Sequence, residues 1–466
     1  MRIKGTITTN FAIRVLVFTA VLLIFITISL IWNFKAKFLN EITSIAVFYS
    51  AYLITPSLHL DKVSIVSPKN LMLLVFFMRL VICPVTILIT GQQSWKLPAE
   101  PTHEDLYLVH LITFVAFYAF VSGWDLLRRA SPGEERPPSP GMKFRNNAVI
   151  ALFLFGSLLF VVYGYYGSLN GYLASIFVED YDASREGQGK LLIYISIILR
   201  YVIPFLGVIL GLVFIHKIKS GIWVRAITAF LFIIIIVFLG LSPSRNNMIF
   251  PVLSFLAACI PIYFRIKFRD FLLGAAGFLI LLFLFQNIRK RENAPMIEEL
   301  NRVEKFVEFV QVYFVAPHIM TPLVTIVENA DTIPFTLHSS LLESIPVLGA
   351  PFRQKSGSYV YNVAYGRAVG PDQVFPTYGE VFFNLGMIGL IFVFMLTGFI
   401  YRKLDRFFMI DTTNDPFLRS LVFYLSLLFN ATIFYSYSVL GQFFYYNSIL
   451  IFAMLIFRDR IGTNNA

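Results

Sequence analysis

The residues of this chain that can do chemistry gather in three hydrophilic segments between long apolar runs. The first segment, 165–190, has the sequence YYGSLNGYLASIFVEDYDASREGQGK and contains Asp182 and Arg185. Arginine binds phosphate through paired hydrogen bonds, a carboxylate can take a proton from a hydroxyl group, and tyrosine rings suit the faces of sugars. The segment is therefore a candidate for binding a sugar or a phosphate, although composition alone favours an ordinary solvated loop. Asp180 and Asp182 have the spacing of a metal-binding pair, but such pairs are so common that we predict no metal site.

The second segment, 240–249, is the short connection GLSPSRNNMI between two apolar runs. Arg245 is its only charged residue. Ser242, Ser244 and the free N–H groups at the start of the following helix would suit an anionic oxygen atom. A helix cap beside an arginine that reaches toward the membrane surface would have the same sequence. The sequence supports these two interpretations about equally.

The third segment, 343–380, has the sequence ESIPVLGAPFRQKSGSYVYNVAYGRAVGPDQVFPTYGE. Its candidate residues are Arg353, Arg367, Asp372 and Glu380, which lie among tyrosines. Guanidinium groups beside aromatic rings are typical of phosphate and sugar binding, and an ordinary ordered loop has the same composition. The sequence contains no nucleotide-binding loop, dinucleotide-binding glycine motif, metalloprotease helix or nucleophile elbow, so we expect no cofactor and no metal.

The rest of the chain must hold these segments in a membrane. Of its 466 residues, 57% are hydrophobic and 14% are charged, and the mean hydropathy is +0.73. A soluble core cannot bury so much apolar surface, whereas a bilayer accepts one helix for each run of about 20 apolar residues. The runs lack the alternation of an outer-membrane barrel, so the predicted fold class is all-α, a polytopic transmembrane helix bundle. The twelve candidate spans lie at 11–33, 42–56, 70–91, 105–127, 147–164, 191–215, 225–241, 248–264, 271–287, 381–401, 417–437 and 440–457.

The basic residues predict how these spans are oriented. If the N-terminus is inside, the inside segments hold 21 lysines and arginines and the short outside segments hold 6. The positive-inside rule then places both termini in the cytoplasm, which requires an even number of spans. We expect a single membrane domain, 1–466, with a Pro-rich cytoplasmic linker at 128–146. Its outside loops are expected at 165–190 and, larger and partly helical, at 288–380.

Some residues outside the three segments also bear on function. Arg79 and Arg200 fall near the middle of predicted spans, where a charge is costly and often functional. The structural alternative is an arginine paired with a buried polar group such as His110 or Asn430. Apolar residues at helical spacing from Met296 to Val310 predict an amphipathic helix on the membrane surface or against the bundle. The net charge of +11 is spread over the ends of the spans, so no nucleic-acid partner is indicated.

Three features of this arrangement are shared with a known family of membrane enzymes. Twelve spans have one mid-sized outside loop after the fifth span and one large outside loop late in the chain. The connection Ser242-Pro243-Ser244-Arg245-Asn246-Asn247 combines small residues with an arginine and leads into an apolar span. The large loop ends in Pro376-Thr377-Tyr378-Gly379-Glu380, followed by the glycine-broken helix VFFNLGMIGLIFVFMLTG. In these features the chain resembles the Wzy-type polymerases of O-antigen and exopolysaccharide repeat units.

The resemblance implies a function at the outer face of the bacterial cytoplasmic membrane. Such enzymes take an oligosaccharide from undecaprenyl diphosphate, transfer it to the end of another lipid-linked unit and release the lipid diphosphate. It implies that arginines stabilise this anionic leaving group, that a carboxylate acts as general base, and that no cofactor takes part. The candidates are Arg185, Arg245, Arg353, Arg367, Asp182, Asp372 and Glu380. The implied partners are the lipid-linked glycans, the lipid bilayer and a chain-length regulator.

Other membrane functions fit parts of the same pattern. An O-antigen ligase would have a similar layout, but ligases characteristically have a histidine near the end of the large loop, and 339–380 contains none. A lipid-linked oligosaccharide flippase or another transporter would also have about a dozen spans and could use Arg79 and Arg200. Transporters, however, usually have repeated halves and short outer loops. A non-catalytic partner in an export complex is also compatible with the sequence, and the layout favours the polymerase.

Overall fold

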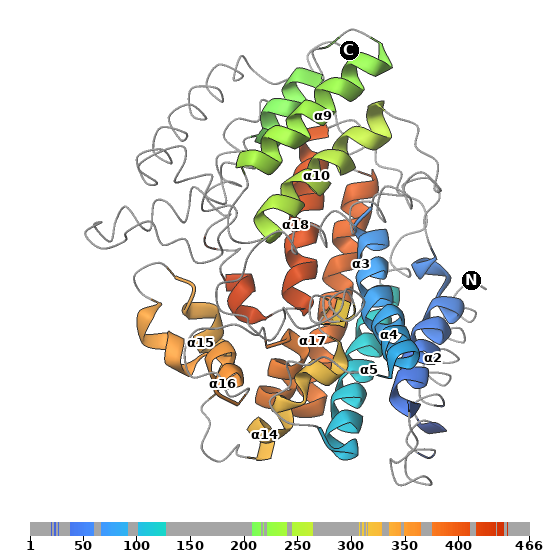
Figure 1. The fold of residues 1–466 in the computed structure, drawn as a ribbon, viewed down its shortest axis with the longest axis vertical. Coiled ribbons are helices and arrows are strands. Elements are labelled where there is room, and N and C mark those ends of the chain that lie inside the picture. Colours follow the sequence, from blue (N-terminus) through green and yellow to red (C-terminus); the bar gives the residue numbers. More distant parts are fainter. Residues whose placement is uncertain are drawn as a thin grey trace, which may run out of the picture.

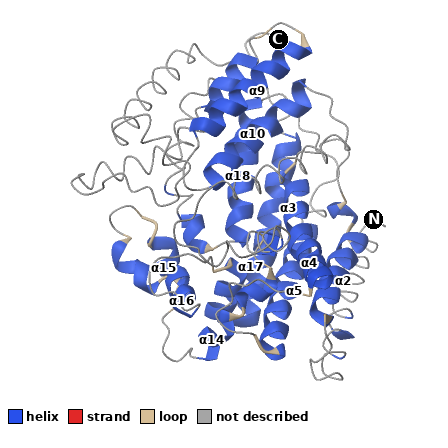
Figure 2. Ribbon diagram, in the orientation of Figure 1, coloured by secondary structure: helices blue, strands red, loops and turns tan. Residues whose placement is uncertain are grey.

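The computed structural model describes the chain in separate ranges and at a few single positions between them. Every secondary-structure element in these ranges is a helix, and no strand occurs in them (Figure 2). The predicted all-α class is therefore confirmed for this part of the chain. The ranges are 38–59, 67–91, 101–126, 207–215, 221–239, 245–263, 316–328, 335–345, 349–364, 375–410, 416–434 and 436–441.

The described helices pack into a bundle around the pair α5, His103–Leu126, and α17, Thr377–Ile410 (Figure 1). One group of neighbours comes from the start of the chain: α2 Leu39–Ile54, η1 Pro56–Leu58, α3 Pro68–Phe77, the π-helical turn η2 Met78–Ile82 and α4 Cys83–Thr90. A second group lies toward the other end of the long axis: α9 Ile222–Leu239, α10 Arg245–Tyr263 and α18 Pro416–Phe434.

Short helices from the range predicted as the large outside loop pack beside α17, and we call them the late-loop cap. Figure 1 shows α14, α15 and α16 near one end of the bundle, far from α9. The cap consists of η4 Pro317–Met320, α14 Pro322–Glu328, α15 Leu337–Leu342, η6 Ala350–Lys355 and α16 Gly357–Ala364.

The predicted amphipathic helix is described only near its end. Val307, Val310 and Gln311 are helical and buried, and Val310 packs in a small apolar cluster with Cys83. The Cys83 thiol also donates to the carbonyl oxygen of Val310 at 3.6 Å. These positions therefore pack against the bundle, while the rest of the predicted helix lies outside the described residues.

Three described helices are long and apolar enough to cross a membrane: Pro68–Thr90, His103–Leu126 and Thr377–Met409. The first two match the spans predicted at 70–91 and 105–127, and the third begins four residues before the span predicted at 381–401 and ends eight residues after it. Shorter apolar helices fall in four other predicted spans, at Leu39–Ile54, Ile222–Ile234, Phe250–Ile260 and Leu418–Asn430. All or most of the remaining spans lie outside the described residues, namely 11–33, 147–164, 191–215, 271–287 and 440–457.

Two glycines bring the backbones of α5 and α17 into direct contact. A Cβ atom added to Gly123 would lie 1.8 Å from the carbonyl oxygen of Met395, and one added to Gly398 would lie 2.0 Å from that of Phe120. Small residues at such crossings let membrane helices approach closely, so that van der Waals contact stabilises the pair. Gly123 and Gly398 therefore permit the short distance between α5 and α17 at the centre of the bundle.

Replacing Gly398 by alanine is expected to destabilise the folded protein by about 1–3 kcal/mol, because the clash is with backbone that cannot rotate away. The thermal unfolding midpoint of detergent-solubilised protein measures this effect. Gly221→Ala is the matched control, because no atom lies within 4 Å of a Cβ added at Gly221. Equal midpoints for the two variants would contradict the close crossing.

Helix α17 consists of two arms that meet at Gly386. Gly386 has φ 65° and ψ −168°, which breaks the helix between a short arm, Thr377–Leu385, and a long arm, Met387–Ile410. The rings of Tyr378 and Phe394 have centroids 6.3 Å apart. In a straight helix these residues would be separated by roughly 24 Å. The short arm therefore folds back toward the long arm, and the glycine-broken helix expected from the sequence is confirmed.

The fold-back carries the start of α17 into the bundle. The long arm passes α3 near its N-terminus, where the Tyr401 hydroxyl donates to the carbonyl oxygen of Pro68 at 3.2 Å. The short arm instead meets the middle of the Pro68–Thr90 span, because Arg79 lies over the Tyr378 ring at 5.0 Å from its centroid. Residues 375–380 are all buried. The start of α17 thus contacts the middle of a helix that is long enough to span a membrane.

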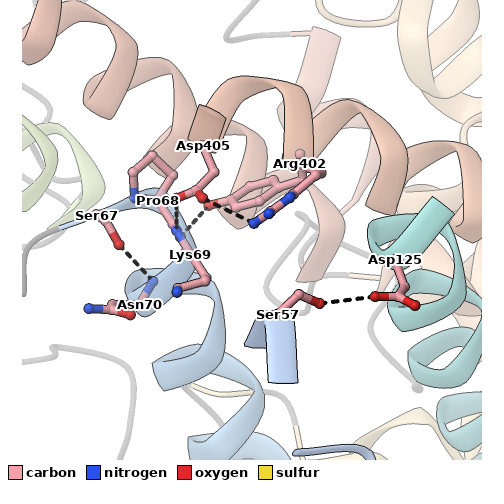
Figure 3. A network of polar contacts seen from close by, with 9 residues as sticks. Ser57, Ser67, Pro68, Lys69, Asn70, Asp125, Arg402 and Asp405 are labelled. Atoms are coloured by element: carbon pink, nitrogen blue, oxygen red, sulfur yellow. Dashed lines mark hydrogen bonds and ion pairs between the residues drawn. The ribbon is translucent and has the colours of Figure 1, made fainter. Parts of the chain in front are cut away.

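At its far end the long arm caps α3 (Figure 3). The Asp405 carboxylate accepts the backbone N–H of Lys69 at 3.0 Å and lies 3.6 Å from the Arg402 guanidinium, while the Ser67 hydroxyl accepts the N–H of Asn70 at 3.2 Å. A carboxylate is favourable at a helix N-terminus because free N–H groups and the helix dipole point at it. Lys69 and Arg402 belong to segments that the charge pattern predicted on one side of the membrane, and here they lie at the same end of the bundle.

Candidate functional site

The structure describes three of the seven predicted site residues. Arg245 is the first residue of α10, as expected for an arginine that leads into a span, and its side chain lies outside the described part. Arg353 and Glu380 are described with their side chains. The other four, Asp182, Arg185, Arg367 and Asp372, lie outside the described residues.

The segment that leads into the short arm is a junction between the cap and the bundle. The Phe375 ring stacks on Tyr361 of α16, with centroids 4.9 Å apart, and the Tyr361 hydroxyl donates to the carbonyl oxygen of Ile319 in η4. Three residues further on, Tyr378 contacts Arg79 of the bundle. A few consecutive residues therefore fix the cap against η2.

Glu380 lies at the centre of this junction and is 0% exposed. Its Oε1 atom accepts hydrogen bonds from the Thr336 hydroxyl at 3.0 Å and the Ser340 hydroxyl at 2.5 Å. The backbone of Tyr437 points toward the same carboxylate. The second oxygen, Oε2, is buried and has no partner in hydrogen-bond geometry among the described residues. Burying a carboxylate oxygen without a hydrogen-bond partner costs free energy. An apolar residue would fill this space without that cost, so the carboxylate needs a specific role.

The neighbours of Glu380 bind one another as well. The Ser340 hydroxyl accepts the backbone N–H of Gly357 at 2.8 Å, and a Cβ atom at Gly357 would lie only 2.2 Å from Glu380 Oε1. The Asn384 amide accepts the N–H of Thr336 at 2.7 Å and donates to its hydroxyl at 2.9 Å. We call these five residues, Thr336, Ser340, Gly357, Glu380 and Asn384, the Glu380 network. It joins α15, α16 and the short arm of α17.

Arg353 lies in η6, between the two cap helices that the network joins. It is exposed, as are Gln354 and Lys355. The Ser356 hydroxyl donates to the Arg353 carbonyl oxygen at 2.9 Å and accepts the N–H of Tyr359 at 3.3 Å, so Ser356 closes η6 and caps α16. Burial raises the pKa of the neighbouring Glu343, while the hydroxyls of Ser356 and Ser438 and the Arg353 charge lower it. Arg353 is thus exposed on a turn closed by Ser356.

Arg79 has different partners from those predicted. Its Nε donates to the carbonyl oxygen of Phe314 at 3.0 Å, and its guanidinium lies over Tyr378. His110 instead bonds the carbonyl oxygen of Leu106 at 2.7 Å, and the Asn430 side chain has no hydrogen bond within the described residues. Neither partner could be predicted, because any residue supplies a backbone carbonyl and the sequence does not show which aromatic ring lies beside an arginine. Arg79 therefore connects η2 to Phe314, which precedes the late-loop cap, and to Tyr378 in the short arm of α17.

His318, in η4, is one of the two histidines of the large loop. It is fully buried, and burial together with the nearby His110 lowers its pKa to about 3. The imidazole is consequently neutral at pH 7. His338 is exposed and stacks on Phe335 with ring centroids 5.9 Å apart. Within the described residues, no three His, Cys, Asp or Glu side chains lie close enough together to hold a metal ion.

Sequence reasoning found Glu380 but missed the rest of its network. The only local signals were the four-residue spacings Thr336–Ser340 and Glu380–Asn384, which place each pair on one helix face. Such spacings are common, so they did not stand out. Comparison with known proteins supplies no further assignment, since no family model, curated protein or solved structure matches this chain.

Proposed function

We propose that this chain is a polymerase of oligosaccharide repeat units carried on undecaprenyl diphosphate, used in the synthesis of O-antigen, capsule or exopolysaccharide. The observation that supports it best is the placement of Arg353. This exposed guanidinium lies on the late-loop cap, which is anchored to the start of the glycine-broken helix α17. The anchoring segment, Pro376–Glu380, is the sequence that carries the family resemblance. A cation at that position suits the diphosphate of a lipid-linked substrate.

The proposed reaction is a substitution at the anomeric carbon of the donor glycan. A hydroxyl oxygen at the end of the acceptor glycan forms a bond to this carbon, and the bond from the carbon to the diphosphate oxygen breaks. The lipid diphosphate leaves with the electron pair, and a carboxylate takes the hydroxyl proton. Cations near the diphosphate lower the barrier because negative charge develops there in the transition state.

The residues proposed for these roles come from the three hydrophilic segments. Arg185, Arg245, Arg353 and Arg367 are proposed to bind the diphosphate, and Asp182 or Asp372 to act as general base. Glu380 was a third candidate for the base, but a base must reach the proton that it removes. Complete burial of the Glu380 carboxylate favours a different role for it. The proposal places the reaction at the outer face of the cytoplasmic membrane, with both termini in the cytoplasm.

Deleting the gene in its bacterial host is expected to reduce the surface glycan to single repeat units. Gel electrophoresis of the extracted glycan would then show a collapsed ladder, which the wild-type gene on a plasmid restores. An unchanged ladder contradicts the proposal. Loss of even the single-unit band indicates a flippase instead, and accumulation of unattached polymer indicates a ligase.

A further inference from the structure

We propose that Glu380 is a positioning residue that holds the exposed turn carrying Arg353 and Lys355 against the short arm of α17. The proposal deepens the proposed function, because it names the group that fixes a diphosphate-binding arginine. It also assigns the buried carboxylate a task other than proton transfer.

The Glu380 carboxylate is linked by hydrogen bonds to both ends of the segment that carries Arg353. Ser340, in α15 before the turn, donates its hydroxyl to Glu380 Oε1, and Gly357, the first residue of α16 after the turn, donates its N–H to that same hydroxyl. The bond between Ser340 and Gly357 closes a loop across 17 positions of sequence. Glu380 fixes the base of this loop, and Arg353 lies four positions before Gly357.

Close packing leaves the carboxylate little freedom to do anything else. The absence of a side chain at Gly357 lets α16 approach until only 2.2 Å would separate an added Cβ from Glu380 Oε1. Thr336 covers Oε1 from the segment before α15, and its own position is fixed by two hydrogen bonds with Asn384 of the short arm. A proton acceptor in such a place has no contact with a substrate hydroxyl unless the junction opens.

The test uses trypsin, which cleaves after arginine and lysine and so reports directly on the turn. Cleavage of a folded segment follows the population of its open form when opening and closing are fast. In purified full-length protein, cleavage after Arg353 or Lys355 is expected to rise roughly tenfold or more in Glu380→Leu, which cannot accept the two hydroxyl bonds. Ser340→Ala, a smaller change, is expected to raise cleavage by a lesser factor. Glu104→Leu, an exposed site at the start of α5, is the control for the same chemical change.

Glu380→Gln separates positioning from proton transfer. Glutamine keeps an oxygen that accepts the hydroxyls of Thr336 and Ser340 but cannot act as a base. We expect wild-type cleavage and polymerisation within about threefold of wild type for this variant, whereas loss of a general base costs roughly 10²–10⁴-fold. A hundredfold loss of kcat with unchanged cleavage would overturn the proposal in favour of the base.

The two kinds of failure can be told apart. Wild-type cleavage rates in both Glu380→Leu and Ser340→Ala would overturn the positioning role, whatever the chain catalyses. If Glu380→Leu does not fold, the Ser340→Ala and Glu380→Gln results decide the matter. Increased cleavage together with a normal glycan ladder after gene deletion would leave the positioning role intact and reject the polymerase function.

Discussion

Membranes that contain the Arg353→Gln variant are expected to polymerise lipid-linked repeat units roughly 10²–10³-fold more slowly than wild-type membranes. This is the usual effect of removing one group that stabilises a developing anion. Glutamine is shorter than arginine and keeps some hydrogen-bonding capacity, but it removes the charge. Because Arg353 is exposed, the amount of folded protein should not change. The measurement is the rate of chain extension from a synthetic undecaprenyl-linked repeat unit, followed on gels.

Two neighbouring variants make this prediction specific. Arg353→Lys retains a point charge without the planar, two-point geometry of a guanidinium, so an intermediate rate is expected. Gln354→Ala alters an equally exposed residue of the same turn and should leave the rate unchanged. If Arg353→Gln polymerises normally, the diphosphate is not bound at η6, and the other three arginines, Arg185, Arg245 and Arg367, become the candidates.

Much of the helical framework follows from apolar runs and from the residues that punctuate them. The predicted spans 70–91 and 105–127 differ by only one or two residues at each end from Pro68–Thr90 and His103–Leu126. The reason is local: Pro68 sits at the first position of its helix, Ser67 caps it, and Gly91 ends it with φ 68°. Such boundary signals act within one helical turn, so the sequence contains them in full.

The position of the helix break is a different matter. The sequence after Glu380 contains Gly386, Gly389 and Gly398, and any of them could have carried the left-handed conformation that glycine tolerates. Only Gly386 does, with φ 65°, whereas Gly398 stays helical and packs against the backbone of α5. What separates their roles is the surface that each one meets. Tertiary contacts, which the local sequence does not encode, therefore determine that the helix breaks at Gly386. This break lets the short arm fold back and bury Tyr378 and Glu380.

The same limit applies to the candidate site. Arg353 and Glu380 were identified by residue type, and their opposite environments, exposed and fully buried, were not. Burial of Glu380 depends on Ser340 and Gly357, which are 40 and 23 positions away in sequence and arrive through α15 and α16. Separations of this size follow no helical period. Residue type in a predicted outside loop therefore suggested a base, whereas the structure shows a buried carboxylate held by two hydroxyls.

Gly357→Ala is expected to damage the cap strongly, because it places a methyl group against Glu380. The new Cβ would lie 2.2 Å from Oε1 and 2.5 Å from Cδ of Glu380, well inside contact distance. Either the carboxylate leaves its two hydroxyl donors or α16 moves away and gives up its bond to Ser340. A hydrogen bond contributes about 1 kcal/mol net and a buried polar atom left without a partner costs more, so the loss of stability should reach roughly 2 kcal/mol or more. Thermal unfolding of the detergent-solubilised protein, with Gly221→Ala as reference, measures it.

A double-mutant cycle shows whether this cost comes from the carboxylate. In a Glu380→Ala background the atoms that clash with the new methyl group are absent, so adding Gly357→Ala should cost little, and the two changes should be strongly non-additive. If the alanine is instead equally damaging in both backgrounds, its effect arises from the backbone of α16, and the close approach of Gly357 to Glu380 is not what holds the cap. Strong coupling would tie the folding of α16, the burial of Glu380 and the placement of Arg353 to one contact.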